Sequence, residues 1–292
     1  MAFSPADLPR PIAFVFSGGV SLGAVQVGML RAVLESGNRP DHLLGSSAGA
    51  LNAAFLAKDI SIRRVEELGR IWRNLRKEDV FGRFTPRRLF HVVFRRISLA
   101  SGEALERLIA AHAPLSYEGL QATLGVVATD YFTGKTEVFT SGDLRRHLLA
   151  SVAIPVVFPP VTIGSVLYVD GSVSAHVPIV PAQRFGPRTL VVFDVGFACH
   201  IRECPCGFVD NALHAFSLML HRQVTGLLSG LDPETTVLYL PAPCPQDVPA
   251  YDFSRGEALI RVGYDAASSF LARLDVTGPG VYGSPHSHGK EP

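Results

Sequence analysis

Short apolar runs that end in glycine and polar residues recur along the first two hundred residues of the chain. The first run, Ile12-Ala13-Phe14-Val15-Phe16, is followed by Ser17-Gly18-Gly19, a pattern typical of a fully buried strand. After Gly23 the apolar residues recur at helical spacing as far as Gly37, a residue type that favours the C-terminus of a helix. The chain is therefore predicted to begin with a strand, a glycine-rich loop and a helix.

The same patterns predict a second strand-to-helix turn and a series of later elements. Leu43-Leu44 leads into a turn at Ser47, and Ala48 to Lys58 has the small and apolar side chains of a buried helix. Further helices are predicted at 61–77, 144–152, 209–228 and 256–274, and further strands at 124–129, 137–139, 161–163, 166–169 and 189–195. Strands that alternate with helices predict an α/β fold in three layers, with a largely parallel central sheet.

The length of the chain favours one large domain. A chain of 292 residues can form a single α/β core, which we expect over residues 1–276. Residues 277–292, TGPGVYGSPHSHGKEP, show no apolar periodicity and are expected to form a disordered tail. The uncharged stretches 11–30 and 148–169 approach the length of a membrane span, but glycines and polar residues interrupt the first and prolines the second. Both are predicted to be buried parts of a soluble protein.

Charge and cysteine content argue against several classes of protein. A formal net charge of +1 provides no concentrated basic surface for nucleic acid. Four cysteines are too few for a disulfide scaffold of this size, so a reduced, cytoplasmic protein is expected. Three of them lie with His200 in CHIRECPC at 199–206, but their spacing matches no standard zinc motif. We expect neither a metal nor a cofactor.

The string Gly45-Ser46-Ser47-Ala48-Gly49 lies where the second predicted strand meets its helix. A sharp G-x-S-x-G turn would expose the hydroxyl of Ser47, with glycines where a Cβ would collide, and Ser46 would point elsewhere. The string alone is a weak signal, because it arises by chance in roughly one chain in five or six of this composition. Its meaning depends on the surrounding sequence.

The glycine-rich loop at 17–23, SGGVSLG, also stands between a predicted strand and a helix. It lacks the lysine of a P-loop and does not fit G-x-G-x-x-G. Its backbone N–H groups could hold a developing oxyanion, or its glycines could simply allow close packing of the helix on the strand. Farther along, Asp170-Gly171 ends a predicted strand, and such a pair by itself is more often a turn than a catalytic group.

Taken together, these segments resemble the patatin-like phospholipases and lipid acyl hydrolases. The resemblance spans roughly residues 12–196 and rests on FSGGVSLGAVQVGML, GSSAGALNAAF, ASVAIPVVFPPV and YVDGSVSAHVPIVPA, in that order. It implies a patatin-like three-layer fold, a catalytic dyad of Ser47 and Asp170 without an essential histidine, and hydrolysis of acyl esters of lipids. It also implies an oxyanion hole at Gly18, Gly19 and Val20, and supporting glycines at Gly23, Gly45, Gly49 and Gly171.

The chain departs from the family pattern at four positions. Val20 and Leu22 stand where the family usually has a third glycine and an arginine, Ser172 replaces a glycine or alanine, and His176 replaces a frequent asparagine. Two alternatives to a lipid hydrolase therefore stay open. One is an acyltransferase or thioesterase with the same dyad, and the other is a catalytically silent lipid-binding protein.

The segment from Phe81 to Ile97 combines basic and aromatic residues. It reads FGRFTPRRLFHVVFRRI, with five arginines, four phenylalanines and no acid. Such a segment suits peripheral contact with an anionic membrane, and equally a surface helix whose aromatic side packs on the core. The predicted partners are thus a lipid or acyl-ester substrate and, through this segment, a membrane surface.

Overall fold

The computed structural model describes residues 8–82, 98, 100–196, 208–224, 226–244, 248–249 and 251–285. The basic segment after Gly82 and the cysteine cluster at 199–206 lie outside these ranges, so the expectations for them stay predictions. None of the helices in the described ranges is both long enough and apolar enough to cross a lipid bilayer.

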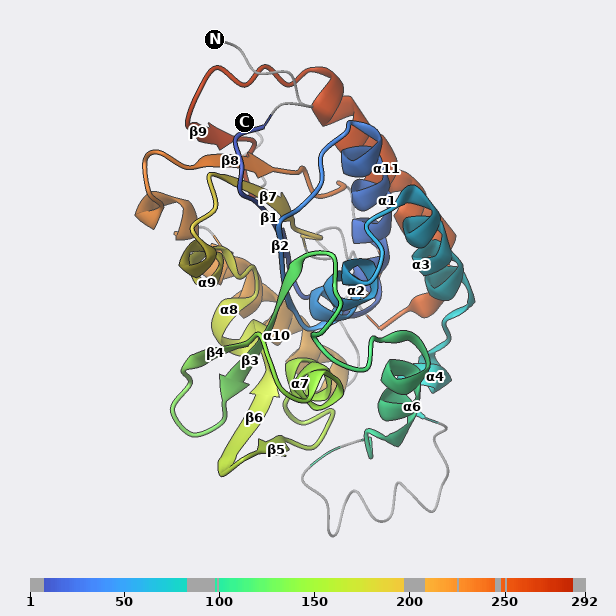
Figure 1. Cartoon of the computed structure of the whole chain (residues 1–292). Coiled ribbons are helices and arrows are strands. Elements are labelled where there is room, and N and C mark those ends of the chain that lie inside the picture. Colours follow the sequence, from blue (N-terminus) through green and yellow to red (C-terminus); the bar gives the residue numbers. More distant parts are fainter. Residues whose placement is uncertain are drawn as a thin grey trace.

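A single mixed sheet of nine strands runs through the described part of the chain (Figure 1). The strands are β1 (Ile12–Phe16), β2 (His42–Ser46), β3 (Thr123–Asp130), β4 (Thr136–Phe139), β5 (Val161–Ile163), β6 (Val166–Asp170), β7 (Thr189–Phe193), β8 (Thr236–Tyr239) and β9 (Gly280–Tyr282). Their order is β5-β6-β3-β2-β1-β7-β8-β9, with β4 also on β3. All pairs from β3 through to β9 along this order are parallel, and β4, β5 and β6 pair antiparallel. The predicted largely parallel sheet is confirmed.

The helices of the described ranges follow the predicted series with four additional α-helices. They are α1 (Gly23–Glu35), α2 (Ala48–Ala57), α3 (Ile62–Asn74), α4 (Lys77–Phe81), α6 (Glu103–His112), α7 (Leu144–Ser151), α8 (Ser172–Ala175), α9 (Ile179–Ala182), α10 (Phe208–Val224) and α11 (Gly256–Ala272), with short 3-10 turns η1 (Val20–Leu22), η2 (Gln183–Phe185), η3 (Leu227–Gly230) and η4 (Phe253–Arg255). The helix predicted at 61–77 ends at Asn74, because Leu75 and Arg76 are extended before α4 begins. Helices α4, α6, α8 and α9 were not predicted.

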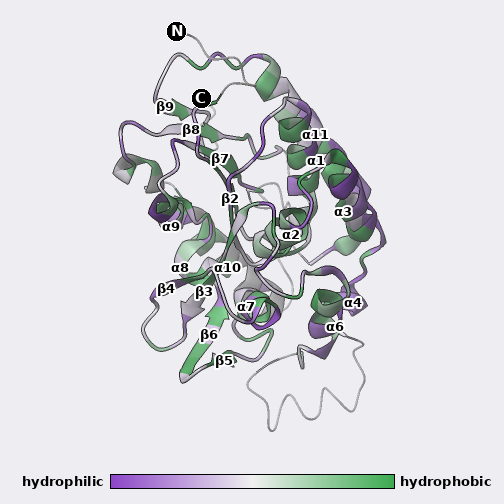
Figure 2. Cartoon of the chain, in the orientation of Figure 1, coloured by the Kyte–Doolittle hydropathy of each residue, from purple (hydrophilic) through white to green (hydrophobic). Residues whose placement is uncertain are grey.

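The sheet separates two layers of helices, as the strand periodicity requires. In β1 the side chains of Ile12, Phe14 and Phe16 enter one apolar cluster, while Ala13 and Val15 enter another. Helices α1, α2, α3 and α11 cover the first face, and α8, α9 and α10 cover the second (Figure 1). Apolar residues concentrate on the strands and on the inner sides of these helices (Figure 2). The fold is therefore the predicted three-layer α/β arrangement.

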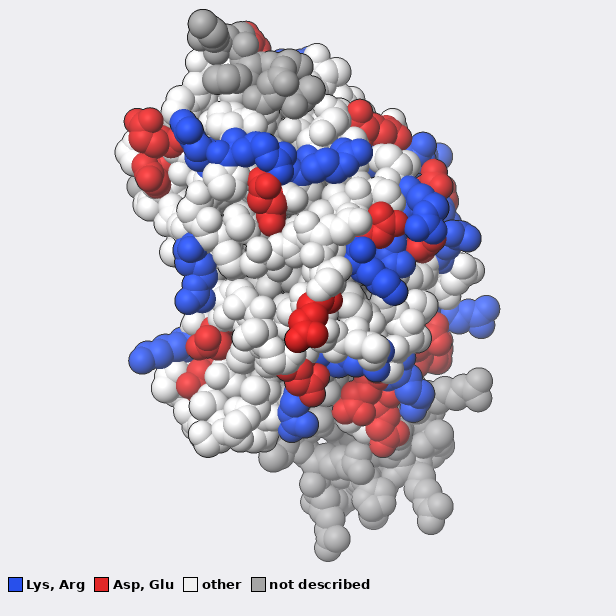
Figure 3. All heavy atoms as spheres, viewed as in Figure 1, with Lys and Arg blue, Asp and Glu red and all other residues white. Residues whose placement is uncertain are grey.

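Helix α3 shows how the outer surface is charged. Its hydroxyl-capped start at Ser61 precedes Arg63, which pairs with Asp59 and Glu67, each at 2.9 Å. Basic and acidic side chains are accordingly interspersed over α3 on the face seen in Figure 3. Exposed pairs of this kind contribute little to stability, so the apolar face of α3 is what holds the helix on the core.

The expectation of a disordered tail from residue 277 is wrong for its first part. Gly280–Tyr282 forms β9, which pairs parallel to β8, and the Gly280 N–H donates to the Thr235 carbonyl at 3.1 Å. The Tyr282 hydroxyl also closes a turn by accepting from the Thr277 N–H at 3.0 Å. A strand of three residues is too short to show an apolar period, so only its pairing with a distant strand reveals it.

Candidate active site

Ser47 lies at a sharp turn between β2 and α2. Its backbone has φ 54° and ψ −129°, in the left-handed half of the map that a non-glycine residue rarely adopts. The turn is tight, because a Cβ on Gly45 would lie 2.5 Å from the Ala50 nitrogen and one on Gly49 would lie 2.4 Å from the Ser17 carbonyl oxygen. The elbow therefore needs both glycines, for the steric reason that the sequence suggested.

Asp170 reaches this turn through the pairing of β6. Strand β4 covers one edge of β3 over Val126–Thr129, so β2 and β6 must share the other edge. Along that edge Ser46 pairs with Val127, and Asp170 pairs with Ala128. Strand β6 thus continues where β2 ends, and its last residue lies beside the elbow.

The two predicted side chains are in direct contact. Ser47 Oγ donates to Asp170 Oδ2 at 2.7 Å, and the Ser172 N–H donates to the other carboxylate oxygen at 2.7 Å. Both residues are buried, with exposed fractions of 4% for Ser47 and 1% for Asp170. The Ser151 hydroxyl accepts from the Ser47 N–H at 3.0 Å, a support that the sequence analysis missed.

Burial sets the protonation of Asp170. Removal from water raises the pKa of this carboxyl from 3.8 to about 6, although hydrogen bonds from Ser47 and Ser172 oppose the rise. The carboxylate is therefore ionised at neutral pH, yet it is a stronger base than an exposed aspartate. A higher pKa brings a general base closer to the pH at which it works best.

The glycine loop after β1 offers fewer donors than the sequence suggested. The Gly18 N–H is occupied, because it donates to the His176 carbonyl at 3.0 Å. In the described part of the chain, the N–H groups of Gly19 and Val20 have no acceptor, and neither has that of Ala48 at the start of α2. A Cβ on Gly18 would lie 2.1 Å from Ser172 Oγ, so a larger residue there would have to displace the Ser172 hydroxyl.

The other residues singled out in the sequence lie near Ser47 and Asp170. Ser46 is buried with its hydroxyl against Gly171, where a Cβ would approach to 2.6 Å, so it faces away from the pocket described next. His176 is also buried near Gly18, but the hydrogen bond of the Ser47 hydroxyl goes to Asp170. Gly23 lies under the indole of Trp72, whose ring carbons would be 2.9 Å from an added Cβ.

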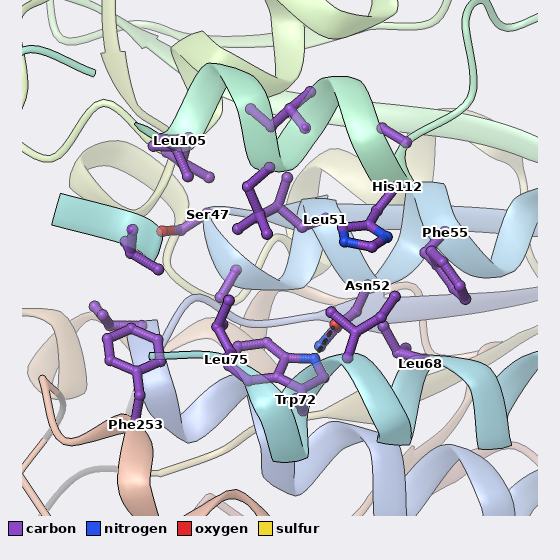
Figure 4. Close-up of a pocket in the computed structure, with 18 of the residues that line it drawn as sticks. Ser47, Leu51, Asn52, Phe55, Leu68, Trp72, Leu75, Leu105, His112 and Phe253 are labelled. Atoms are coloured by element: carbon purple, nitrogen blue, oxygen red, sulfur yellow. Dashed lines mark hydrogen bonds between the residues drawn. The ribbon is translucent and has the colours of Figure 1, made fainter. Parts of the chain in front are cut away.

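An apolar pocket opens beside Ser47. The space between its lining residues, open solvent at the mouth included, amounts to about 810 Å³. Helices α2, α3 and α6 form its walls, with Ser47 at one end and Phe55 at the other (Figure 4). The lining is mainly aliphatic and aromatic, as in Leu51, Leu68, Trp72, Leu105 and Phe253. The pocket therefore suits a hydrocarbon chain attached to a group at Ser47.

The same region holds no evident metal site. Among the residues described, no cluster of three or more histidine, cysteine, aspartate or glutamate side chains could bind a metal ion.

The molecule is thus a three-layer α/β protein in which a serine at a strand-to-helix elbow is hydrogen-bonded to a buried aspartate. A family model described as patatin-like phospholipase matches residues 14–182, which contain both members of the pair. The chain belongs to the patatin-like phospholipase family.

Several curated relatives are similar to this chain. "Patatin-like phospholipase domain-containing protein 7" of Rattus norvegicus is 27% identical over 188 residues, 63% of this chain and 14% of the relative. "Lysophospholipase NTE1" of Eremothecium gossypii is 24% identical over 313 residues, 96% of this chain and 19% of the relative. "Uncharacterized protein YqhO" of Bacillus subtilis is 27% identical over 289 residues, 88% of this chain and 97% of the relative. The chain thus spans under a fifth of the length of the first two relatives.

Proposed function

We propose that the protein hydrolyses acyl esters of lipids, with Ser47 as the nucleophile and Asp170 as the general base. The observation that carries this proposal is the 2.7 Å hydrogen bond between Ser47 Oγ and Asp170 Oδ2 at one end of an apolar pocket. Membership of the patatin-like phospholipase family supports a lipid ester as the substrate.

In the first half of the reaction, Ser47 Oγ bonds to the ester carbonyl carbon while Asp170 takes the hydroxyl proton. The carbonyl oxygen becomes an oxyanion, which the N–H groups of Gly19 and Val20 would bind because both lack another acceptor in the described structure. The bond to the leaving alcohol then breaks, and Asp170 returns its proton to the departing oxygen. The product of this half is an acyl group esterified to Ser47.

In the second half, water replaces the alcohol. Asp170, ionised again, removes a proton from a water molecule as that water attacks the acyl carbon. The tetrahedral intermediate collapses, Ser47 Oγ regains a proton from Asp170, and a carboxylic acid leaves. The pKa of about 6 for Asp170 suits both roles, because the group must give up and regain a proton within one cycle.

The pocket indicates which part of the substrate binds where. Its lining offers apolar contact along its length, so the acyl chain would occupy it while the alcohol portion leaves on the other side of Ser47. The names of two relatives contain "phospholipase" and "lysophospholipase", which supports a phospholipid ester as the lipid. Acyl transfer to another alcohol or thiol would use the same acyl-enzyme and differ only in the acceptor.

The direct test is hydrolysis of a lipid panel that includes lysophosphatidylcholine and phosphatidylcholine. Release of fatty acid by the wild-type protein, and its loss in Ser47→Ala, would support the proposal. A fluorophosphonate probe should label the wild-type protein at Ser47. Failure of both release and labelling in the folded wild-type protein would instead support a silent lipid-binding protein.

We also propose that the segment from Phe81 to Ile97 assists contact with anionic membranes. The reason is its sequence of five arginines with four phenylalanines, of which Phe81 packs on Phe158 and Phe253 and the other three follow Gly82. Sedimentation with phosphatidylserine vesicles should weaken as salt rises, because salt screens exposed charges beyond about 8 Å at physiological ionic strength. The double variant Arg87→Glu and Arg88→Glu should bind less, and equal binding would refute the proposal.

A further inference from the structure

Trp72, the single tryptophan of the chain, belongs both to the pocket and to the loop beside Ser47. It lies on α3, is 7% exposed and lines the pocket wall (Figure 4). The six-membered ring of its indole packs on Gly23, where an added Cβ would meet two ring carbons at 2.9 Å. Gly23 directly follows η1, the turn that contains Val20. One side chain therefore touches both the pocket and the end of the glycine loop.

Hydrogen bonds extend this contact inward. Trp72 Nε1 donates to Asn52 Oδ1 at 2.9 Å, the bond drawn in Figure 4. Asn52 Nδ2 in turn donates to Gln26 Oε1 at 2.8 Å and to the Gly23 carbonyl at 3.0 Å. Asn52 lies on α2 and Gln26 on α1, so the bonds join the helices that follow the two turns of the site.

Gln26 completes the path at the base of the glycine loop. Its Nε2 donates to the Ser17 carbonyl at 2.8 Å and to the Phe193 carbonyl at 3.1 Å. Ser17 directly precedes Gly18, and its hydroxyl donates to the Gly18 carbonyl at 3.0 Å. Gln26, Asn52 and Ser17 are at most 1% exposed. Without water to replace a lost partner, each of these bonds restricts the loop more than a surface bond would.

We propose that Trp72, Asn52 and Gln26 are positioning residues that hold the loop from Ser17 to Gly23 in the conformation that binds the oxyanion. The inference rests on the proposed function. The loop needs such support because Val20 adopts φ 51°, which a β-branched residue keeps only when its surroundings enforce it. An acyl chain that packs on the pocket face of Trp72 would stabilise the same arrangement, so chain binding and loop order are coupled.

The first test uses the variant Trp72→Phe to distinguish a positioning role of Trp72 from a role as part of the pocket wall alone. Phenylalanine keeps an aromatic wall but lacks the N–H that Asn52 accepts. We expect kcat for p-nitrophenyl acetate and p-nitrophenyl decanoate to fall by about tenfold to a hundredfold, with KM for the decanoate within about threefold of wild type. An unchanged kcat with a raised KM for decanoate would show that Trp72 only forms the wall, and would overturn the proposal.

Leu75→Ala is the matched control. Leu75 lines the same pocket from the end of α3 and takes part in none of these hydrogen bonds. Its loss should raise KM for the decanoate ester and change kcat by less than about twofold, since it removes apolar contact alone. An equal loss of kcat in Leu75→Ala and Trp72→Phe would contradict a special role for the hydrogen bonds.

A second measurement needs no variant. Decanoate, a product of the decanoate ester, should change the fluorescence of Trp72 when it binds the wild-type protein. At saturation it should slow amide hydrogen exchange in a peptide covering 17–23. A fluorescence change without slower exchange in 17–23 would refute the coupling between chain binding and loop order. This result does not depend on whether Trp72→Phe folds.

The outcomes distinguish this inference from the proposed function. If the wild-type protein hydrolyses neither ester, the proposed function fails. If it hydrolyses both, but Trp72→Phe changes only KM and decanoate leaves the exchange of 17–23 unaltered, the positioning proposal alone fails.

Discussion

The turn after β1 and the turn after β2 lie side by side at the carboxyl ends of paired strands, and each holds one non-glycine residue at positive φ. These residues are Val20 at 51° and Ser47 at 54°. Ser47 is held by hydrogen bonds at both its N–H and its hydroxyl, to Ser151 and Asp170. The Val20 N–H has no acceptor in the described structure, and the Val20 carbonyl accepts from the Gly23 N–H within the turn.

The proposed chemistry needs the side chain of Ser47, whereas at Val20 it needs only the backbone N–H. At the elbow, the unusual backbone brings the Ser47 hydroxyl to Asp170, so the interaction and the conformation support each other. In the first turn, a glycine would adopt the same φ without cost, and the valine side chain adds only a wall of the pocket. Substitution of the Ser47 side chain should therefore affect activity far more than substitution of the Val20 side chain.

The largest effect is expected for Ser47→Ala. Because it removes the nucleophile, kcat/KM for a lipid ester should fall by about ten-thousandfold or more. Fluorophosphonate labelling should disappear, while circular dichroism stays unchanged. Ser46→Ala is the matched control, since its hydroxyl faces Gly171. Retained activity in Ser47→Ala would show that Ser47 is not the nucleophile.

Asp170→Asn should have the next largest effect, a loss of about a thousandfold in kcat/KM. Asparagine keeps the shape of the side chain and can still accept from the Ser172 N–H, but it cannot take the Ser47 proton. Initial rates with the same ester would check this. A loss below about tenfold would mean that another group acts as the base.

The same variant should gain relative stability as the pH rises. The pKa of Asp170 is raised from 3.8 to about 6 in the fold, so the wild-type protein loses stability as the pH climbs through this range. The difference corresponds to at most about 3 kcal/mol. In urea unfolding, the free energy of unfolding of Asp170→Asn relative to wild type should therefore be greater at pH 8 than at pH 4. If the difference in unfolding free energy between the two proteins were the same at both pH values, the pKa of Asp170 would not be raised in the folded state.

His176→Asn should reduce kcat by less than about tenfold, or roughly 1.4 kcal/mol of barrier. The backbone carbonyl of His176 accepts from the Gly18 N–H, and this hydrogen bond survives the substitution. Activity should still decline below about pH 6, as Asp170 is protonated. If kcat of His176→Asn fell a thousandfold, or if its activity did not decline below about pH 6, His176 would be indicated as the base.

The smallest effect is expected for Val20→Gly. Relief of strain should be offset by lost packing and by the greater freedom of glycine in the unfolded chain, so the free energy of unfolding should change by less than about 1 kcal/mol. Wider access to the Val20 N–H should raise kcat/KM by a few fold at most. Parallel unfolding and rate measurements would check both. A large loss of activity would show that the valine side chain itself supports the oxyanion loop.

Local patterns predicted much of this molecule. The strand at 12–16 was predicted residue by residue, and the helix after Gly23 and the hairpin at 161–169 were placed closely, because apolar periodicity and glycine act over a few residues. The elbow followed from two glycines near a serine. The pairing of Ser47 with Asp170 followed from family resemblance, since nothing local connects residues so far apart along the chain.

The tertiary structure alone decided the rest. The Gly18 amide is occupied by the His176 carbonyl, β9 is a strand because β8 lies beside it, and Trp72 reaches the loop through Asn52 and Gln26. Each of these depends on a donor meeting an acceptor, or a ring meeting a glycine, from another part of the chain. Sequence periodicity reports which side of an element is buried, but the partner of each buried polar atom is determined only when the elements pack together.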